Sequence, residues 1–268
     1  MVEVFVDDGF IVDLGTAITL YIPSEAEQIA FYEDFQLHNH IEHILVDDDN
    51  KFFFAKNDCL LKNTENGNIE LVLGCKNSNI PSVHIIGRSS FNGVDMNCLA
   101  LPESVFAIGQ TAFANSTLKE IKFNSGIENI EDMAFLFTNI KSVFIPPRVK
   151  NIGYGVFSGC KMLKEITVDE SNDKYYSKNN CIIEKTTECL IACSQNAIVP
   201  EGVKNIGVLT FYGFDKDCVI TLPTSVTHIN KVKMAIPSSI QFPITFKAPK
   251  GSYAIRFAKD NGIKYIEI

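Results

Sequence analysis

The chain has no run of basic residues, and no apolar run that approaches the length of a membrane span. General nucleic-acid binding needs a basic face, whereas this chain is acidic, with a formal net charge of −8 and a pI of about 5.2. A transmembrane helix needs about 20 consecutive apolar residues. We therefore expect no nucleic-acid partner and no membrane insertion.

The N-terminal stretch MVEVFVDDGFIVDLG lacks the basic segment of a secretory signal, and acidic residues interrupt its apolar positions. As it stands, this stretch does not predict a signal peptide. Two explanations stay open: the protein is cytosolic, or it is exported with a leader that precedes Met1.

Motifs of known catalytic chemistry are also missing. There is no GxSxG nucleophile elbow and no glycine-rich phosphate loop. The eight cysteines form no CxxC pair, and no second pair completes a zinc site with the CxxxC spacing of Cys189 and Cys193. We expect free, mostly buried thiols, because free cysteine behaves as a small hydrophobic residue. The sequence favours a protein that is not an enzyme and holds no cofactor and no metal.

The dominant feature that is present is a repeat with a period of 22 residues. With 268 residues, 46% hydrophobic and 21% charged, the chain can bury a substantial core. The period is marked by two series, Ile86, Ile108, Ile130 and Ile152, and Phe91, Phe113, Phe135 and Phe157. Three of the isoleucines are followed by Gly87, Gly109 and Gly153, and the remaining place holds Glu131.

Each unit reads LP..V..IG..AF......L..I.F, as in LPESVFAIGQTAFANSTLKEIKF. Its LxxIxF part alternates with period 2 and predicts a short strand, which a proline such as Pro146 ends. The Ile-Gly pair predicts a turn, and the Ala-Phe pair predicts a short helical or irregular return with Phe in the core. One unit cannot bury its own apolar edge, so stacked units should align identical positions into ladders, about 4.8 Å apart at the strands.

A longer repeat lies over the first. Residues 44–62 match residues 166–184 at an offset of 122. Each copy continues into an apolar strand and then a proline, Pro81 or Pro200. Polar turns between apolar runs predict a β-hairpin, so we expect two hairpins that are inserted into coils and project from the stack.

Taken together, these motifs resemble the BspA-like leucine-rich repeats, irregular 22- to 24-residue units built on LP.sv..Ig..AF..c..L..I.iP. The inserts and the ending TFKAPKGSYAIRFAKDNGIKYIEI are also similar to bacterial members, and the likeness covers about residues 20 to 268. The resemblance implies a right-handed leucine-rich-repeat solenoid, mainly β with short helical or 3-10 returns and two inserted β-hairpins. It further implies protein binding or adhesion, display on the cell surface or secretion, and no shared catalytic residues.

Departures from the family pattern indicate degenerate ends. The family's cysteine after Phe is kept only as Cys160, and residues 227–242 lack the Ala-Phe pair. We expect one solenoid domain over residues 1–268, with degenerate N-terminal coils (1–43), a hairpin insert (44–81), regular repeats (82–168), a second insert (169–200), degenerate repeats (201–244) and a C-terminal cap (245–268).

Residues between the inward strand positions should form an exposed ladder, which we call the sheet face. We predict a partner-binding surface there, made of His43, Leu45, Ala100, Glu120, Lys122, Ser142, Phe144, Glu165, Thr167 and Thr221. Phe144 stands out beside Lys122 and Thr167, because partner surfaces combine aromatic anchors with polar rims. Alternatively, Phe144 packs against neighbouring coils or a hairpin.

The stretch LHNHIEHIL raises the question of a metal, because it holds His38, His40 and His43. These histidines include no i, i+4 pair of the zincin type. The repeat register makes Ile41 and Ile44 core residues and points His43 outward. We expect solvated histidines, with a weak adventitious metal site as the alternative.

The acidic loops VDDDN and VDESND, which begin at Val46 and Val168, are predicted to cap turns. Calcium binding is the alternative, although the order of residues in an EF-hand loop is absent.

The sequence therefore favours a non-catalytic binding module, displayed or secreted, that engages a host or other cell-surface protein through its sheet face. A structural spacer or an intracellular scaffold is the alternative, and the oligomeric state stays open.

Overall fold

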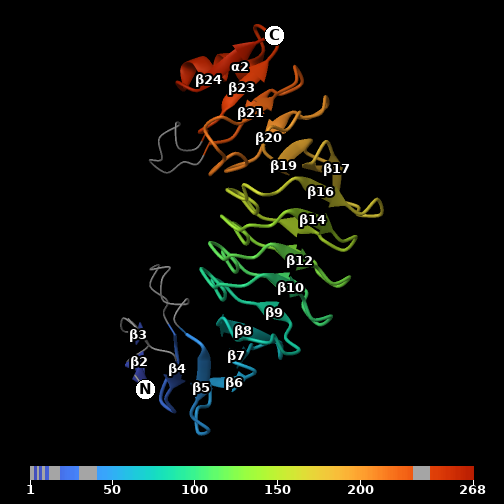
Figure 1. Cartoon of the computed structure of the whole chain (residues 1–268). Helices are drawn as coiled ribbons and strands as arrows, with labels where there is room; N and C mark the ends of the chain where they lie inside the picture. The colour runs from blue at the N-terminus through green and yellow to red at the C-terminus, as the bar shows by residue number, and fades with distance from the viewer. Residues whose placement is uncertain (1–2, 5, 8–9, 12–18, 30–40, 232–241) are drawn as a thin grey trace.

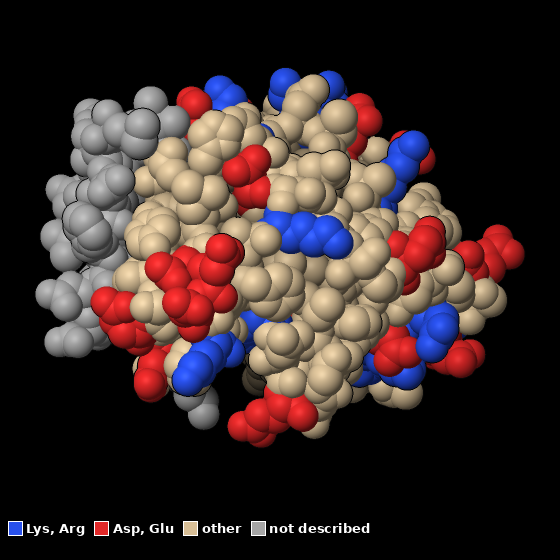
Figure 2. All heavy atoms as spheres, turned by 90° about the horizontal axis from the view of Figure 1, so that it is seen from below, with Lys and Arg blue, Asp and Glu red and all other residues tan. Residues whose placement is uncertain are grey.

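The computed structural model describes residues 3–4, 6–7, 10–11, 19–29, 41–231 and 242–268. The chain coils into an elongated β-solenoid of about ten turns, with β4 (Thr19–Ile22) and β24 (Lys264–Glu267) near opposite ends of the stack (Figure 1). The predicted solenoid of mainly β structure is confirmed. Figure 2 looks along the stack from below and shows acidic and basic side chains interspersed among uncharged ones.

The strands that carry the sheet face pair in parallel from coil to coil. They form four short sheets: β1 (Glu3–Val4), β4 and β5 (His43–Val46); β10 (Cys98–Ala100) and β12 (Glu120–Lys122); β14 (Ser142–Ile145) and β16 (Glu165–Val168); β21 (Val219–Thr221), β23 (Thr245–Ala248) and β24. A separate pair joins β2 (Val6–Asp7) to β3 (Phe10–Ile11).

A second side of the solenoid carries two larger sheets. One runs β15 (Asn151–Ile152), β13 (Asn129–Ile130), β11 (Ala107–Ile108), β9 (Ile85–Ile86), β8 (Ile69–Gly74), β7 (Cys59–Asn63) and β6 (Phe53–Lys56). The other runs β17 (Tyr175–Lys178), β18 (Cys181–Glu184), β19 (Cys189–Cys193), β20 (Asn205–Ile206) and β22 (His228–Ile229).

The third side consists of the returns, which are chains of turns; they fit the irregular alternative of the prediction rather than short helical or 3-10 segments. Ala112 N–H donates to Gly109 O within its coil, whereas Phe113 N–H donates to Ala134 O in the next coil, at 2.8 Å. Thr111 has a positive φ of 54°, which helps to turn alternate N–H groups toward the neighbour. Because these donors are used between coils, a helix cannot form. Glycine suits the start of the return, since a Cβ on Gly109 would lie 2.8 Å from Arg88 N.

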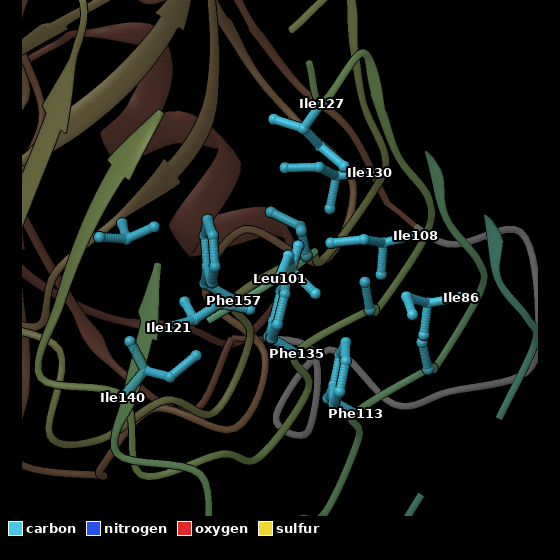
Figure 3. Close-up of a cluster of buried hydrophobic side chains, with 14 of the residues drawn as sticks. Ile86, Leu101, Ile108, Phe113, Ile121, Ile127, Ile130, Phe135, Ile140 and Phe157 are labelled. Carbon is cyan, nitrogen blue, oxygen red and sulfur yellow. The ribbon is translucent and has the colours of Figure 1, made fainter. Parts of the chain in front are cut away.

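The predicted ladders are present in the core. Ile86, Ile108, Ile130 and Ile152 are successive register partners in the second sheet. Beside them the rings of Phe91, Phe113, Phe135 and Phe157 stack at centroid distances of 5.4, 5.4 and 5.5 Å. Figure 3 labels three of these rings, Phe113, Phe135 and Phe157. Every ring lies in the same place in its coil, so Phe113 and Phe135 are each sandwiched between two copies, which adds offset stacking to apolar burial.

The two inserts form antiparallel meanders, which we call the first meander (β6–β8) and the second meander (β17–β19). The predicted hairpins exist as the pairs β6–β7 and β17–β18. They do not project, however, because each has a third strand that joins the repeat ladder in parallel: β8 pairs with β9, and β19 with β20. The expectation of projecting hairpins is wrong in this respect.

The meanders divide the core into three parts. Leu60 packs in the N-terminal cluster, whereas Cys59 and Leu61 pack in the central one. In the second meander Ile182 packs in the central cluster, and Ile183 in the C-terminal one. Alternate side chains point to opposite faces of a strand, so β7 and β18 each form a wall with core on both sides.

The only α-helix among the described residues, α2 (Tyr253–Asp260), lies between β23 and β24. Ser252 is the N-cap of this helix, and its hydroxyl accepts a hydrogen bond from Ile255 N–H at 3.4 Å. The helix buries Ala254, Ile255 and Ala258 against the C-terminal core. Within the described residues no helix is both long and apolar enough to cross a membrane.

Candidate functional site: the sheet face

The structure places all ten predicted sheet-face residues at outward strand positions. Nine are exposed, namely His43, Leu45, Ala100, Glu120, Lys122, Ser142, Phe144, Glu165 and Thr167, and the tenth, Thr221, is half-buried. Between them the inward residues Ile121, Val143 and Ile166 are buried. The period-2 alternation of each short strand therefore produces the face, because its apolar half is held in the core.

Register aligns these residues into columns. Ala100 lies opposite Lys122 in one sheet, and Phe144 opposite Thr167 in the next. A backbone hydrogen bond links the two sheets: Lys141 N–H donates to Lys119 O at 3.2 Å. Four successive coils therefore present one surface, with Phe144 in the column of Lys122.

The sheet face carries exposed apolar side chains. Leu45 is 53% exposed and Phe144 is 52% exposed, so Phe144 does not pack into a neighbouring coil. Ile198, 61% exposed, extends the face because it bridges to Thr221 in parallel. Ile266 of β24 is 45% exposed and lies opposite Lys247 of β23. These two isoleucines were not among the predicted residues, although the alternation of NAIVP and KYIEI is a signal that could have identified them.

Four lysines lie on or beside the sheet face: Lys122 is on it, and Lys119, Lys141 and Lys164 directly precede β12, β14 and β16. Among the described residues no carboxylate lies within 4.0 Å of the ammonium of Lys119, Lys122, Lys141 or Lys164. On the second side Arg148 and Lys150 both contact Glu128 at 2.9 Å. The Lys150 hydrogen bond, followed by the bond from Arg148, holds the pKa of Glu128 below its ordinary value.

The histidine cluster falls largely outside the described residues, since His38 and His40 are not among them. Ile41 and Ile44 are buried, as the repeat register predicts. His43 Nδ1 lies 3.1 Å from Asp58 Oδ1 at the surface. The described residues contain no group of three or more His, Cys, Asp or Glu side chains arranged to hold a metal.

The acidic loops are turn caps in the structure. Asp47 accepts hydrogen bonds from Tyr21 Oη at 2.6 Å and from Asp49 N–H at 2.9 Å, and these bonds hold the pKa of its carboxyl below the ordinary value. Asp169 accepts from the hydroxyl and the N–H of Ser171, which lowers its pKa in the same way. Both carboxylates serve the local turns.

The thiols fit the prediction of free, mostly buried cysteines. All eight are free, Cys98 is exposed, Cys189 is half-buried and the others are buried. Cys160 occupies the family's structural position, where its thiol contacts Phe135 O at 3.0 Å. Burial raises the pKa of Cys160 to about 11, so its reactive thiolate is scarce at neutral pH.

One hollow in the described surface lies off the sheet face, at the corner beside the second meander. It has a volume of about 880 Å³, and Phe137 and Tyr212 line it. An ion pair of 2.6 Å joins Lys161 to Asp215 at its rim. Its lining contains no histidine, and its charged residues are Lys161, Asp215, Lys216 and Asp217.

Comparison with known proteins identifies the repeats. A family model described as a BspA type leucine rich repeat region matches residues 73–185 in 6 copies. No curated protein matches the chain.

Several solved bacterial structures are similar to the chain. They include a leucine-rich repeat protein from Eubacterium ventriosum, with 18% identity, a TM-score of 0.49, and 73% of this chain and 65% of that chain covered. A leucine-rich cell surface protein from Faecalibacterium prausnitzii has 16% identity and a TM-score of 0.49. The match covers 93% of this chain and 78% of that chain. The pneumococcal vaccine antigen PcpA has 15% identity and a TM-score of 0.47. The match covers 99% of this chain and 84% of that chain. This chain thus spans slightly less than two thirds of the Eubacterium chain.

Repeats of this type are found in interaction and adhesion modules, which are typically non-catalytic. The six matched copies span residues 73–185, so these central stacked coils are built from repeats of the BspA type.

Proposed function

We propose that this protein is a non-catalytic binding module, displayed on the cell surface or secreted, that holds an acidic protein segment on its sheet face. The observation that carries the proposal is the exposed Phe144 amid four lysines that lack an ion-pair partner among the described residues. The repeat family, which is one of interaction modules, supports the same function.

Phe144 supplies the apolar anchor. Its ring is half exposed in a strand whose neighbours are fixed by the ladder, so it is presented with little freedom to fold back. Aromatic side chains bury much area for a small entropy cost, and they dominate the energetics of many interfaces. Thr167 and Lys122 beside it provide a polar rim.

The lysines set the partner's charge. Lys119, Lys141 and Lys164 follow one another on successive coils, because Lys164 N–H donates to Lys141 O at 2.9 Å and Lys141 N–H to Lys119 O. Neighbouring like charges repel, and the acidic residues that directly follow these lysines in the sequence are Glu120 and Glu165. An acidic segment would relieve this repulsion and would be steered to the face, although the whole chain carries a charge of −8.

A peptide pair of matched composition tests this function. One peptide alternates glutamate with leucine and the other alternates lysine with leucine, and fluorescence anisotropy measures binding to the intact chain. We expect the acidic peptide to bind more tightly, with an affinity that falls as salt rises. Phe144→Ala and Lys141→Gln should each weaken binding several-fold, as should Lys122→Glu.

Lys150→Gln is the matched control, since it also removes one exposed positive charge, but on the second side. Phe144→Ala should change the free energy of unfolding by less than about 0.5 kcal/mol, because the side chain is on the surface. Equal binding of both peptides, or binding unchanged by the three sheet-face substitutions, would remove this surface from consideration and leave a spacer or scaffold role.

Display at the surface has its own test. Intact producing cells are treated with a protease, and the chain is then detected with an antibody. Loss of the chain from intact cells, or its presence in the culture medium, supports display or secretion. Full protection in intact cells together with digestion after lysis would place the protein inside the cell.

A further inference from the structure

Two cysteines of the second meander face each other directly. Cys181 of β18 and Cys193 of β19 are register partners in an antiparallel ladder. The next pair outward is hydrogen-bonded, because Ser194 N–H donates to Asn180 O at 3.0 Å. Hydrogen-bonded and non-hydrogen-bonded pairs alternate in such ladders, so the two cysteines form a non-hydrogen-bonded pair.

That kind of pair suits a disulfide. Opposite Cα atoms in non-hydrogen-bonded pairs lie about 4.5 Å apart, with their side chains on the same face of the sheet. Disulfides need Cα atoms about 4.4–6.8 Å apart and Cβ vectors that converge. The backbone of the second meander therefore already provides the separation that a bond between the two sulfur atoms requires.

We propose that Cys181 and Cys193 become joined by a disulfide when the chain folds in an oxidising environment. The two thiols release two protons and two electrons as the bond between the sulfur atoms forms. A second disulfide, of a small molecule or of an oxidoreductase, accepts them and leaves as two thiols. This inference does not depend on what the sheet face binds.

The bond would form during folding rather than afterwards. Both cysteines are buried in the folded chain, at 0% and 3% exposure. The neighbouring Cys181 thiol and burial raise the pKa of Cys193 well above its ordinary value, so the attacking thiolate is scarce once the core has closed. Before closure the same thiols are accessible, and the β18–β19 connection keeps them close in sequence.

Other cysteines do not share this geometry. In the first meander Cys59 lies opposite Gly74, so it has no directly opposed thiol. Cys218 also lies near Cys193, but its sulfur accepts a hydrogen bond from Asn196 N–H at 3.1 Å. Cys181 and Cys193 are the pair that the register selects among the described residues.

The test refolds the full chain from urea in a buffer of reduced and oxidised glutathione, blocks free thiols by alkylation, and maps the products by mass spectrometry. We expect six alkylated cysteines, the eight of the chain minus two, and a peptide that links Cys181 to Cys193. The urea midpoint of this product should fall on reduction.

Two variants sharpen the test. Cys218→Ser should still yield the linked peptide, whereas Cys181→Ser should leave Cys193 alkylated and make the urea midpoint insensitive to reductant. Eight alkylated cysteines after oxidative refolding would overturn the proposal, and so would a bond from Cys193 to Cys218 in the unsubstituted chain.

Discussion

The two meanders follow one plan at an offset of 122 residues, yet they differ at the places where they meet the neighbouring coils. Both ladders carry a register shift at the same place, between Leu60 and Leu61 and between Ile182 and Ile183. The first meander contacts the first phenylalanine of the stacked series at Gly74, where an added Cβ would overlap Phe91 Cε1. The corresponding register position in the second meander holds Cys193.

The difference shows how a repeated plan adapts to its neighbours. Phe91 is the first ring of the stacked series, and it occupies the space that a side chain at position 74 would need. A side chain is accommodated at position 193, and Cys193 packs in the C-terminal core cluster. The strand pairing of each wall is therefore determined by hydrogen bonds within the meander. The size of the side chain at each position is determined by the residues packed against that face.

The largest effect should come from breaking each wall at its centre. Leu60→Ala and Ile182→Ala remove fully buried side chains at equivalent positions, and each should lower the free energy of unfolding by about 2–5 kcal/mol. Urea titration measures the loss. If one substitution costs less than 1 kcal/mol, the two walls are not equivalent supports of the core.

Asn50 and Asn172 occupy equivalent places and clamp the preceding coil. Asn172 Nδ2 donates to Pro146 O and Val149 O, each at 3.0 Å. In the same way, Asn50 Nδ2 donates to Pro23 O and Ala26 O of the coil before it. Replacement of Asn172 by alanine leaves the Val149 carbonyl unpaired, and Pro146 O keeps only the Val149 N–H at 3.4 Å, so the change should cost about 1–3 kcal/mol. Asn139→Ala, at an exposed position, is the control and should change the urea midpoint little.

Gly74→Ala tests the reason for the difference between the meanders. The added methyl group must displace the Phe91 ring, and overpacking of this kind costs about 1–3 kcal/mol. Combining Gly74→Ala with Phe91→Leu should recover part of that loss, because the ring edge is then gone. An unchanged urea midpoint in Gly74→Ala alone would show that the space beside Phe91 does not require glycine.

Tyr175→Phe makes the second meander resemble the first, which has Phe53 at this place. The Tyr175 hydroxyl accepts a hydrogen bond from the buried Ile152 N–H at 3.1 Å. Its loss should cost about 1 kcal/mol, with Tyr176→Phe as a control that removes a hydroxyl from the adjacent, half-buried tyrosine. Hydrogen exchange should show the Ile152 amide less protected in the first variant alone.

The last prediction concerns pH, and its effect is absent at neutral pH. Burial raises the pKa of Cys59 to about 12 from an ordinary value of 9.0, so above pH 9 the unfolded chain loses a proton that the folded chain keeps. This contribution to stability is complete below pH 9 and is lost as the pH rises toward 12. We expect the urea midpoint to fall between pH 8 and pH 10.5, and to fall less steeply in Cys59→Ala. An equal pH dependence in the variant would contradict the assignment.

Much of the fold could be predicted from the sequence because the repeat is so regular in its core positions. The 22-residue spacing of Ile108 and Phe113 places each copy above the last, and the alternation around Phe144 points its ring outward. The returns were harder to predict, because their N–H groups are divided between their own coil and the next one. That division is visible only once the coils are stacked.

The prediction of sheet-face residues succeeded in the coils where the 22-residue period is intact. It was incomplete in the parts of the chain where that period is interrupted. Ile198 follows the second meander, outside any regular unit, and it joins the face only through its bridge to Thr221. The same is true of the lysines: the sequence contains Lys119, Lys141 and Lys164 at steps of 22 and 23 residues, but it does not say which carboxylates lie within reach.

The sequence by itself determined the solenoid, its ladders of Ile and Phe, and the outward positions of the short strands, because a fixed spacing of apolar residues can be buried only by stacking. The tertiary structure alone decided that the inserts are walls within the core, that Lys119 and its neighbours lack ion-pair partners among the described residues, and that Cys181 faces Cys193. Each of these depends on which segments lie side by side, and residues far apart in the chain meet only after the coils are in register.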